Sequence, residues 1–326
     1  MSYVLKIFHY ICRMKELFRL CHTHLLLIVA TMFASCYTGT ESTPRIKVDK
    51  EVLYQPTIEE LVIDNNFSDK GCHTWSEGKA FTSIEEALSP MLRPEDDATL
   101  IDNGLKGEIF TYKGYREENI FGDKAVVYLL FECNGHTYSY YTGKSIEEIK
   151  ESNYLPLIPS LIDMDAVAMA RSLFVGKQLY ILTNHWYNLQ GNVIEGNHLV
   201  AVNVTAVEPG NNVLPLAIHF TDQRGVEAQV YITTKSSAHT QMLSFDRLFS
   251  YKNPREEHED ISDEVWQAIT ESRLLKGMTK NECRLSIGLP SEVNKIPTYN
   301  GLKEQWLYNS GAYLFFSDGI LEEFRQ

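Results

Sequence analysis

The stretch GMTKNECRLSIGLP, residues 277–290, specifies its own local structure more completely than any other part of the chain. Thr279 and Glu282 have the spacing of a capping box, in which each side chain accepts a hydrogen bond from the backbone N–H of the other residue. Gly288 suits the left-handed conformation that ends many helices, and Pro290 prevents the helix from continuing. The stretch therefore predicts a short helix of about two turns.

The residues on both sides of this helix predict a small independent module over 262–326. Ser262 is placed to cap an earlier helix over 263–270, whose first turn is acidic, as the helix dipole favours. Apolar and aromatic segments follow at 303–308, 312–316 and 320–324, separated by turn residues. We expect an ααβββ module, in which two helices cover one face of a small antiparallel sheet.

This module resembles the SmpA/OmlA (BamE-like) family of outer-membrane lipoproteins, and the resemblance covers residues 262–326 alone. The residues that carry it are Gly277-Met278-Thr279, Glu282-Cys283-Arg284, Ile287-Gly288-Leu289-Pro290, Trp306-Leu307-Tyr308 and Leu314-Phe315-Phe316-Ser317-Asp318-Gly319. In that family the module is a non-enzymatic binding platform near the outer membrane. The resemblance implies that an exposed sheet edge or a helix groove binds a partner.

Residues 1–35 predict a signal peptide. Basic residues precede the apolar run LLLIVATMF at 25–33, and the small residues Ala34 and Ser35 follow it. This apolar run is too short to span a bilayer as a stable anchor. Met14 is an alternative start, because Met14-Lys15 would open a signal of more usual length.

The cysteine that follows Ala34-Ser35 looks like the lipid-attachment residue of a bacterial lipoprotein. Cys36 would be acylated on sulfur and become the mature N-terminus, although Phe33 stands where an aliphatic residue is commoner. The alternatives are an uncleaved anchor helix and a plain signal peptide followed by an unrelated cysteine. We expect a protein of the bacterial cell envelope, anchored to the outer membrane through Cys36.

The composition is that of a folded, acidic protein. Hydrophobic residues make up 44% and charged residues 22%, and the formal net charge is −13. Nucleic acid is therefore excluded as a partner, since its phosphates would be repelled. An anionic bilayer would repel the same charge, so the lipid anchor would have to hold the protein at the membrane.

The rest of the chain predicts an α+β protein with a long β-rich region. We expect a tether at 36–56, one or two β-rich domains at 57–250 with a division near 175, and a linker at 251–261. Asn134-Gly135 lies between two apolar runs and predicts a hairpin. Strands at roughly ten-residue spacing after residue 177 suggest a small barrel or sandwich, such as an SH3-like barrel.

Three further segments have the spacing of a capping box and predict helix starts. They begin at Thr57, Ser83 and Ser145, each followed three residues later by a glutamate. The intervals between them differ, so they do not indicate a repeat.

No residue pattern in the sequence indicates a catalytic, metal or cofactor site. Cys72, Cys133 and Cys283 form no C-x-x-C pair, and a metal site that combines Cys72 with His73, or Cys133 with His136, is a weaker interpretation than a buried thiol. The tyrosines at 138, 140 and 141 could stack on a sugar or peptide, or pack across strands.

Two hypotheses about function follow. The first is an envelope lipoprotein that binds a protein or a wall component and has no chemistry of its own. The alternative is a cell-wall or glycan-processing hydrolase with its catalytic groups in residues 60–250.

Overall fold

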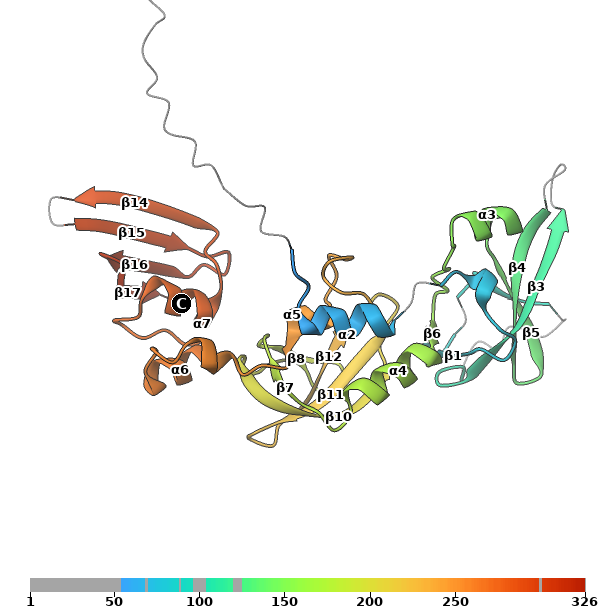
Figure 1. The fold of residues 1–326 in the computed structure, drawn as a ribbon, viewed down its shortest axis with the longest axis horizontal. Coiled ribbons are helices and arrows are strands. Elements are labelled where there is room, and N and C mark those ends of the chain that lie inside the picture. The colour runs from blue at the N-terminus through green and yellow to red at the C-terminus, as the bar shows by residue number, and fades with distance from the viewer. Residues whose placement is uncertain are drawn as a thin grey trace, which may run out of the picture. The chain divides into compact units, whose positions relative to one another are not determined.

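The computed structural model describes residues 54–67, 70–87, 89–95, 104–119, 125–298 and 301–325 (Figure 1). Residues Pro56–Gln326 form one compact unit. The fold is mixed and rich in strand, with curled antiparallel sheets, of which the described residues form three. The predicted signal peptide, Cys36 and most of the expected tether lie outside the described residues.

The first sheet has six strands and lies between residues 80 and 163. Asn134 and Gly135 have φ of 52° and 81° and join two of its strands, which confirms the predicted hairpin. Helix α3 (Ile146–Glu151) and the short helix η1 (Cys72–Thr74) contribute Ile149 and Cys72 to its aromatic core. The strands, in sheet order, are β2 (Leu92–Pro94), β5 (His136–Tyr141), β4 (Ala125–Cys133), β3 (Ile109–Asn119), β1 (Ala80–Ser83) and β6 (Leu161–Asp163).

The central sheet has seven strands, and three helices cover one of its faces. In sheet order the strands are β13 (Phe249–Ser250), β7 (Gln178–Ile181), β10 (Val200–Pro209), β11 (Leu216–Asp222), β12 (Glu227–Ile232), β8 (His185–Tyr187) and β9 (Val193–Glu195). The covering helices are α2 (Ile58–Asn66), α4 (Met164–Phe174) and α5 (Phe245–Leu248), which share one apolar core with the sheet (Figure 1). Helix α2 reaches this core through Ile63, although the whole first sheet separates it from the central strands in sequence.

The C-terminal sheet has four strands, where the sequence predicted three. Helices α6 (Asp263–Thr270) and α7 (Lys280–Ile287) precede β14 (Glu292–Thr298), β15 (Gly301–Leu307), β16 (Tyr313–Ser317) and β17 (Ile320–Arg325). The additional strand, β14, is polar and contains Pro297. It forms an edge of the sheet, where a residue without a backbone N–H is tolerated because only one side of the strand is paired. Both helices contribute side chains to the core beneath Trp306.

Three of the four predicted capping boxes form, and one does not. Thr57, Ser145 and Thr279 each accept a hydrogen bond from the N–H three residues later, and the glutamate there caps in return. Ser83 instead ends strand β1, where it pairs with Leu161, so the predicted helix start is wrong. Strand pairing over a long sequence distance has overridden the local preference.

The end of helix α7 differs in detail from the expected left-handed cap. Gly288 has a positive φ of 83°, which favours glycine, but its ψ of −166° is extended. The chain therefore leaves the helix directly into an extended segment that leads to the edge strand β14.

A group of polar and aromatic side chains fixes α7 to the C-terminal sheet. Lys280 Nζ lies 2.7 Å from Glu304 Oε1, and the indole Nε1 of Trp306 donates to Glu304 Oε2 at 3.1 Å. The Glu304 side chain is only 4% exposed, and Arg284 lies over the Trp306 ring at 4.8 Å. The hydrogen bond from Lys280 is the main reason that the pKa of Glu304 is lowered.

We predict that Glu304→Gln lowers the free energy of unfolding by about 2 kcal/mol at neutral pH, because it removes a charged hydrogen-bond acceptor. The pKa of Glu304 is lower in the folded than in the unfolded protein, where it is about 4.3. The stabilisation is therefore complete above that pH and is lost as the pH falls through the folded pKa. Urea unfolding of wild type and variant should converge in acid.

The matched control is Glu323→Gln, which changes an exposed glutamate of β17. It should alter the free energy of unfolding by less than about 0.5 kcal/mol. A Glu304→Gln deficit that is equally large at neutral and acidic pH would contradict the assigned role of the carboxylate.

Position 196 requires a glycine, because the backbone there lies directly against a core side chain of the central sheet. Trp186 is fully buried, donates from Nε1 to the carbonyl of Thr183 at 2.8 Å, and meets Phe220 edge-on. A Cβ added at Gly196 would overlap the indole ring of Trp186.

We predict that Gly196→Ala lowers the free energy of unfolding by about 3 kcal/mol, because a packed core cannot absorb the added methyl group. Thermal or urea unfolding measures the loss. Gln190→Ala, an exposed change in the turn between β8 and β9, is the control and should be close to neutral. Equal unfolding midpoints for the two variants would show that Trp186 can move aside.

Candidate functional site

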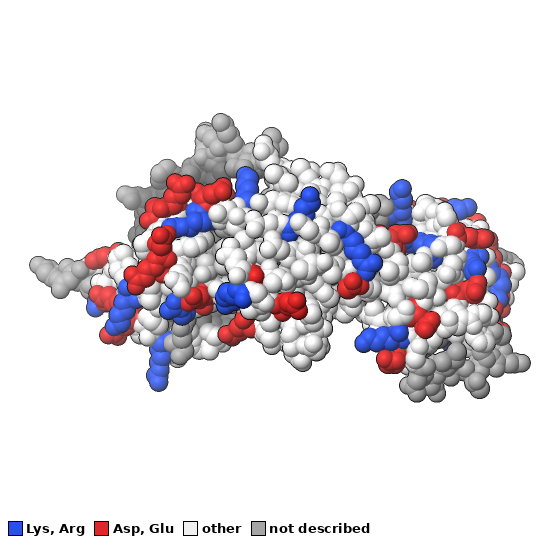
Figure 2. Space-filling model, turned by 90° about the horizontal axis from the view of Figure 1, so that it is seen from below, with Lys and Arg blue, Asp and Glu red and all other residues white. Residues whose placement is uncertain are grey.

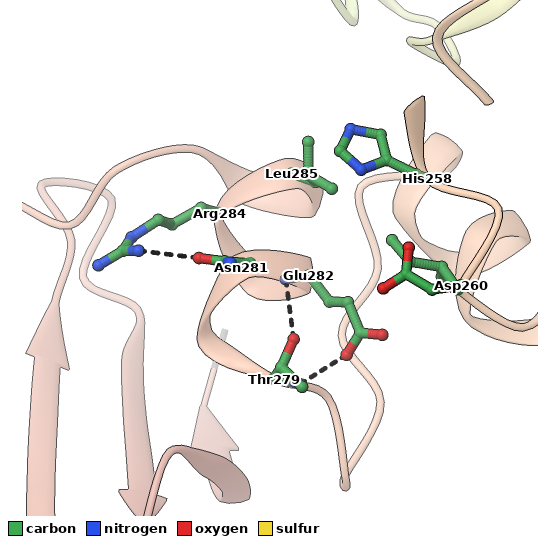
Figure 3. Close-up of a pocket in the computed structure, with 8 residues that line it drawn as sticks. His258, Asp260, Thr279, Asn281, Glu282, Arg284 and Leu285 are labelled. Atoms are coloured by element: carbon green, nitrogen blue, oxygen red, sulfur yellow. Dashed lines mark hydrogen bonds between the residues drawn. The ribbon is translucent and has the colours of Figure 1, made fainter. Parts of the chain in front are cut away.

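A groove of about 520 Å³ runs beside helix α7 (Figure 3). Figure 3 shows Leu285 and His258 facing each other at one end, and the Glu282 carboxylate directed toward Asp260. The lining residues are His258, Asp260, Ile261, Thr279, Asn281, Glu282, Arg284 and Leu285.

One wall of the groove belongs to the segment expected to be a linker, 251–261, and local contacts hold it in place. The Arg255 guanidinium donates to the carbonyls of His258 and Ile261, each at 2.5 Å, and lies over the Trp266 ring at 5.1 Å. The segment also contains the short helix η2 (Pro254–Glu257). The wall therefore has a defined shape.

The other wall is helix α7, whose polar groups are mostly engaged with each other. Thr279 and Glu282 form the capping box, and Arg284 Nη1 donates to Asn281 Oδ1 at 3.1 Å. These side chains therefore stabilise the helix, which is the role that the sequence predicted for this stretch. The groove offers a shallow polar surface to a ligand.

The C-terminal sheet has an open face with apolar side chains. Residues paired directly across strands share a face, and on the face opposite Trp306 the pairing places Leu307 beside Tyr313. The exposed apolar residues on this outward face are Ile296 (55% exposed), Ile320 (43%), Phe315 (42%) and Tyr313 (39%). Lys303, Glu323 and Arg325 lie among them. Exposed apolar groups gathered on one face indicate an interaction surface.

The central sheet also has an outward face, opposite the helices, where strand pairing places Glu227 beside Thr221 and Glu208 beside Ala217. Strands β7, β10, β11, β12 and β8 contain no lysine or arginine. Their acidic residues, Glu208, Asp222 and Glu227, lie at or next to a strand end. In Figure 2 the middle of the view is mostly white, and several basic and acidic residues also lie within it.

Aromatic and neutral hydrogen-bonding side chains also occupy this face. Strand pairing aligns His219 with Gln229 and Gln229 with Tyr187, and it places Asn203 beside Thr221. Tyr231 lies next to this row, with its ring edge-on to that of Tyr187 at 5.1 Å between centroids. Burial raises the pKa of Tyr231, so its hydroxyl stays protonated at neutral pH and can donate a hydrogen bond.

The cysteines of the described region are buried and protonated. Burial raises the pKa of Cys72 and Cys133 to about 11 and that of Cys283 to about 12. A nucleophilic or metal-binding cysteine needs a lowered pKa instead. Within the described ranges, no group of three or more His, Cys, Asp or Glu side chains is placed to hold a metal ion.

The other residues that the sequence indicated as candidates for a site are Cys36 and the tyrosines at 138, 140 and 141, and only the tyrosines lie in the described part of the structure. Cys36, the proposed lipid-attachment residue, lies outside the described residues. Tyr138 and Tyr140 are buried in the first sheet, which agrees with packing across strands rather than a stacking platform. Tyr141 is exposed and lies against Tyr128 at 5.3 Å between ring centroids.

Both open sheet faces were missed by the sequence interpretation. For the central sheet, the sequence signal is carried by alternate residues of four segments, in which most outward positions are uncharged. These segments are 178–181, 200–208, 216–222 and 227–232. Strand pairing must be known before these positions can be assembled into one surface.

None of the helices in the described ranges has the length and apolar character needed to cross a bilayer. Comparisons of the sequence and structure with protein-family models, curated proteins and solved structures found no match.

Proposed function

We propose that the protein is a lipid-anchored binding protein of the bacterial cell envelope. In this proposal Cys36 carries the acyl chains that hold the protein at the outer membrane, and the C-terminal module binds another protein. The sequence Ala34-Ser35-Cys36 after an apolar run supports the anchor. The resemblance of residues 262–326 to the SmpA/OmlA (BamE-like) family supports a non-enzymatic role for the module.

The outward face of the C-terminal sheet is the observation that carries the proposal. Tyr313, Phe315, Ile320 and Ile296 expose apolar area that water would leave if a partner covered it. Burying one such side chain completely contributes about 1.5–3 kcal/mol to the free energy of binding. These four residues can therefore form the energetically dominant centre of an interface. Lys303, Glu323 and Arg325 lie among these residues and give the face charges of both signs. The expected partner is a protein surface with a matching apolar patch.

The proposal also covers the detailed folds of the C-terminal module and of the central sheet. The order of helices α6 and α7 and strands β15, β16 and β17 supports an ααβββ module of the BamE-like kind, to which β14 would add an edge strand. The antiparallel run of β10, β11 and β12 in the central sheet supports an SH3-like relationship.

The anchor is tested by growing bacteria that express the full chain with radioactive palmitate. We expect label on the wild type, and we expect Cys36→Ala to lose the label and to leave the membrane fraction. Cys21→Ala, in the segment that cleavage would remove, is the control and should keep the label. Unchanged labelling of Cys36→Ala would rule out the proposed attachment residue.

The protein-binding face is tested with a photoreactive benzophenone amino acid in place of Phe315. Irradiation of intact cells should give a discrete cross-linked product, because Phe315 would lie at the centre of the interface. Tyr313→Asp should reduce its yield by at least about tenfold, since a buried unpaired charge disfavours the complex. The same probe in place of Leu157, which is 74% exposed beside the first sheet, is the control. Identical products from both positions would refute a specific interface.

A further inference from the structure

The outward face of the C-terminal sheet consists of three rows of side chains, each of which crosses all four strands. Helices α6 and α7 belong to the opposite side, where they share a core with Trp306 and Phe316. Residues paired across strands lie side by side on one face, so the registers give the rows directly. The first row is Glu292, Leu307, Tyr313 and Arg325, the middle row is Asn294, Gln305, Phe315 and Glu323, and the last row is Ile296, Lys303, Ser317 and Ile320.

The charges within these rows balance, unlike those of the whole chain. The rows hold two acidic residues, Glu292 and Glu323, and two basic residues, Lys303 and Arg325, whereas the chain has 43 acidic and 30 basic residues. Glu322, the unpaired residue of the bulge in β17, adds a negative charge at the edge of the sheet. A strongly basic or strongly acidic partner would therefore find no matching field on this face.

A second copy of the face is complementary to the first when a twofold axis runs nearly along the strands. Such an axis reverses the strand order, so that β14 lies over β17 of the second copy and each row meets the same row in reverse. Glu292 then lies over Arg325 of the second copy, and Leu307 lies over its Tyr313. Sheets that pack face to face cross at about 30°, which an axis inclined by about 15° to the strands produces.

The other two rows also meet without like charges in this arrangement. One contact is between apolar side chains, and the two remaining charged residues face neutral ones. The four contacts of these rows are Ile296 with Ile320, Phe315 with Gln305, Glu323 with Asn294, and Lys303 with Ser317.

An axis perpendicular to the strands, along the middle row, gives a poorer match. It keeps the strand order and exchanges the first row with the last, so Glu323 would lie over Glu323 of the second copy and Glu292 over its Ile296. Like charges placed opposite each other disfavour a complex, and a charge against apolar surface loses water without gaining a partner. The charges therefore select the axis along the strands.

We propose that the partner of the protein-binding face is a second copy of this chain, in a twofold dimer with Glu292 against Arg325 at both edges and apolar contacts between them. This inference rests on the proposed function, because it names the partner of the same face. Four strands at about 4.8 Å and five residues at about 3.4 Å make a face of about 19 Å by 17 Å. A face of this size gives a small interface, so we expect a Kd of about 1–100 µM.

The first part of the test detects the dimer with the full chain in a density-matched detergent. Sedimentation equilibrium should show monomer and dimer in exchange, with a Kd in that range. Two forms of the chain carry different affinity tags, and one of them has the benzophenone amino acid in place of Phe315. Irradiation should give a product of twice the mass that contains both tags, and peptide mapping should place the cross-link near Gln305 of the second copy.

Charge reversal is the second part of the test. Arg325→Glu and Glu292→Arg should each weaken the dimer by at least about tenfold, because each creates two like-charge contacts per dimer. The double variant exchanges the charges and should return the Kd to within about threefold of the wild type. In one chain the two residues lie three strands apart, about 14 Å, so only contacts between copies can cause this restoration. Glu227→Arg, at an exposed position of the central sheet, is the control and should dimerise like the wild type.

Three results would overturn the inference. They are a chain that stays monomeric up to about 0.5 mM, a dimer that the single charge reversals leave unchanged, and a dimer that they weaken but the double variant does not restore. Cross-linking at Phe315 in intact cells separates this failure from that of the proposed function. A product that contains a different protein, from a chain that is monomeric in sedimentation, would refute the second copy and keep the proposed function. The absence of both product and dimer would refute both.

Discussion

Each antiparallel sheet in this protein must bury one face, and this constraint determines where everything else lies. A sheet is stable in water only when apolar side chains on one side are covered. Helices α2, α4 and α5 cover the central sheet, and α6 and α7 share a core with the C-terminal sheet. Once one face is covered, the opposite face can carry polar residues, although Ala201, Ala217 and Gln229 on that side of the central sheet are still buried. The two candidate surfaces are the outward faces of these two sheets.

Local features of the fold were predictable where a few neighbouring residues decide the structure. All four of the predicted local features that form depend on hydrogen bonds between residues close in sequence: the capping boxes at Thr57, Ser145 and Thr279 and the hairpin at Asn134-Gly135. Ser83 has the same spacing but pairs with Leu161, a partner about eighty residues away that no local pattern reveals. Strand β14 was missed because its polar sequence has no apolar alternation, and pairing with β15 along its whole length is what makes it a strand.

The candidate surfaces were harder to predict than the helices, because a face is a property of several strands together. Within one strand, an outward residue such as His219 or Tyr231 is only one polar position among alternating apolar ones. Its neighbours on the surface, Gln229 and Tyr187, come from strands that are adjacent only after folding. The tyrosines at 138, 140 and 141 suggested a possible stacking surface because they are close in sequence, yet two of them are buried. Successive side chains along a strand point to opposite faces, so residues that are close in sequence do not all belong to one surface.

The chemistry of the two faces suggests how they could act together. The face around Phe315 is apolar with charges of both signs among the apolar residues, and that around Tyr231 is polar and carries Glu208 and Glu227, so the two faces differ in chemistry. Two sites on one chain gain from each other when both ligands are held in one compartment, since the second binding event becomes intramolecular. A lipid anchor at Cys36 would strengthen this effect, because it would confine the chain to the surface where both ligands lie. Each site could then be individually weak, which is what an open sheet face without a deep pocket provides.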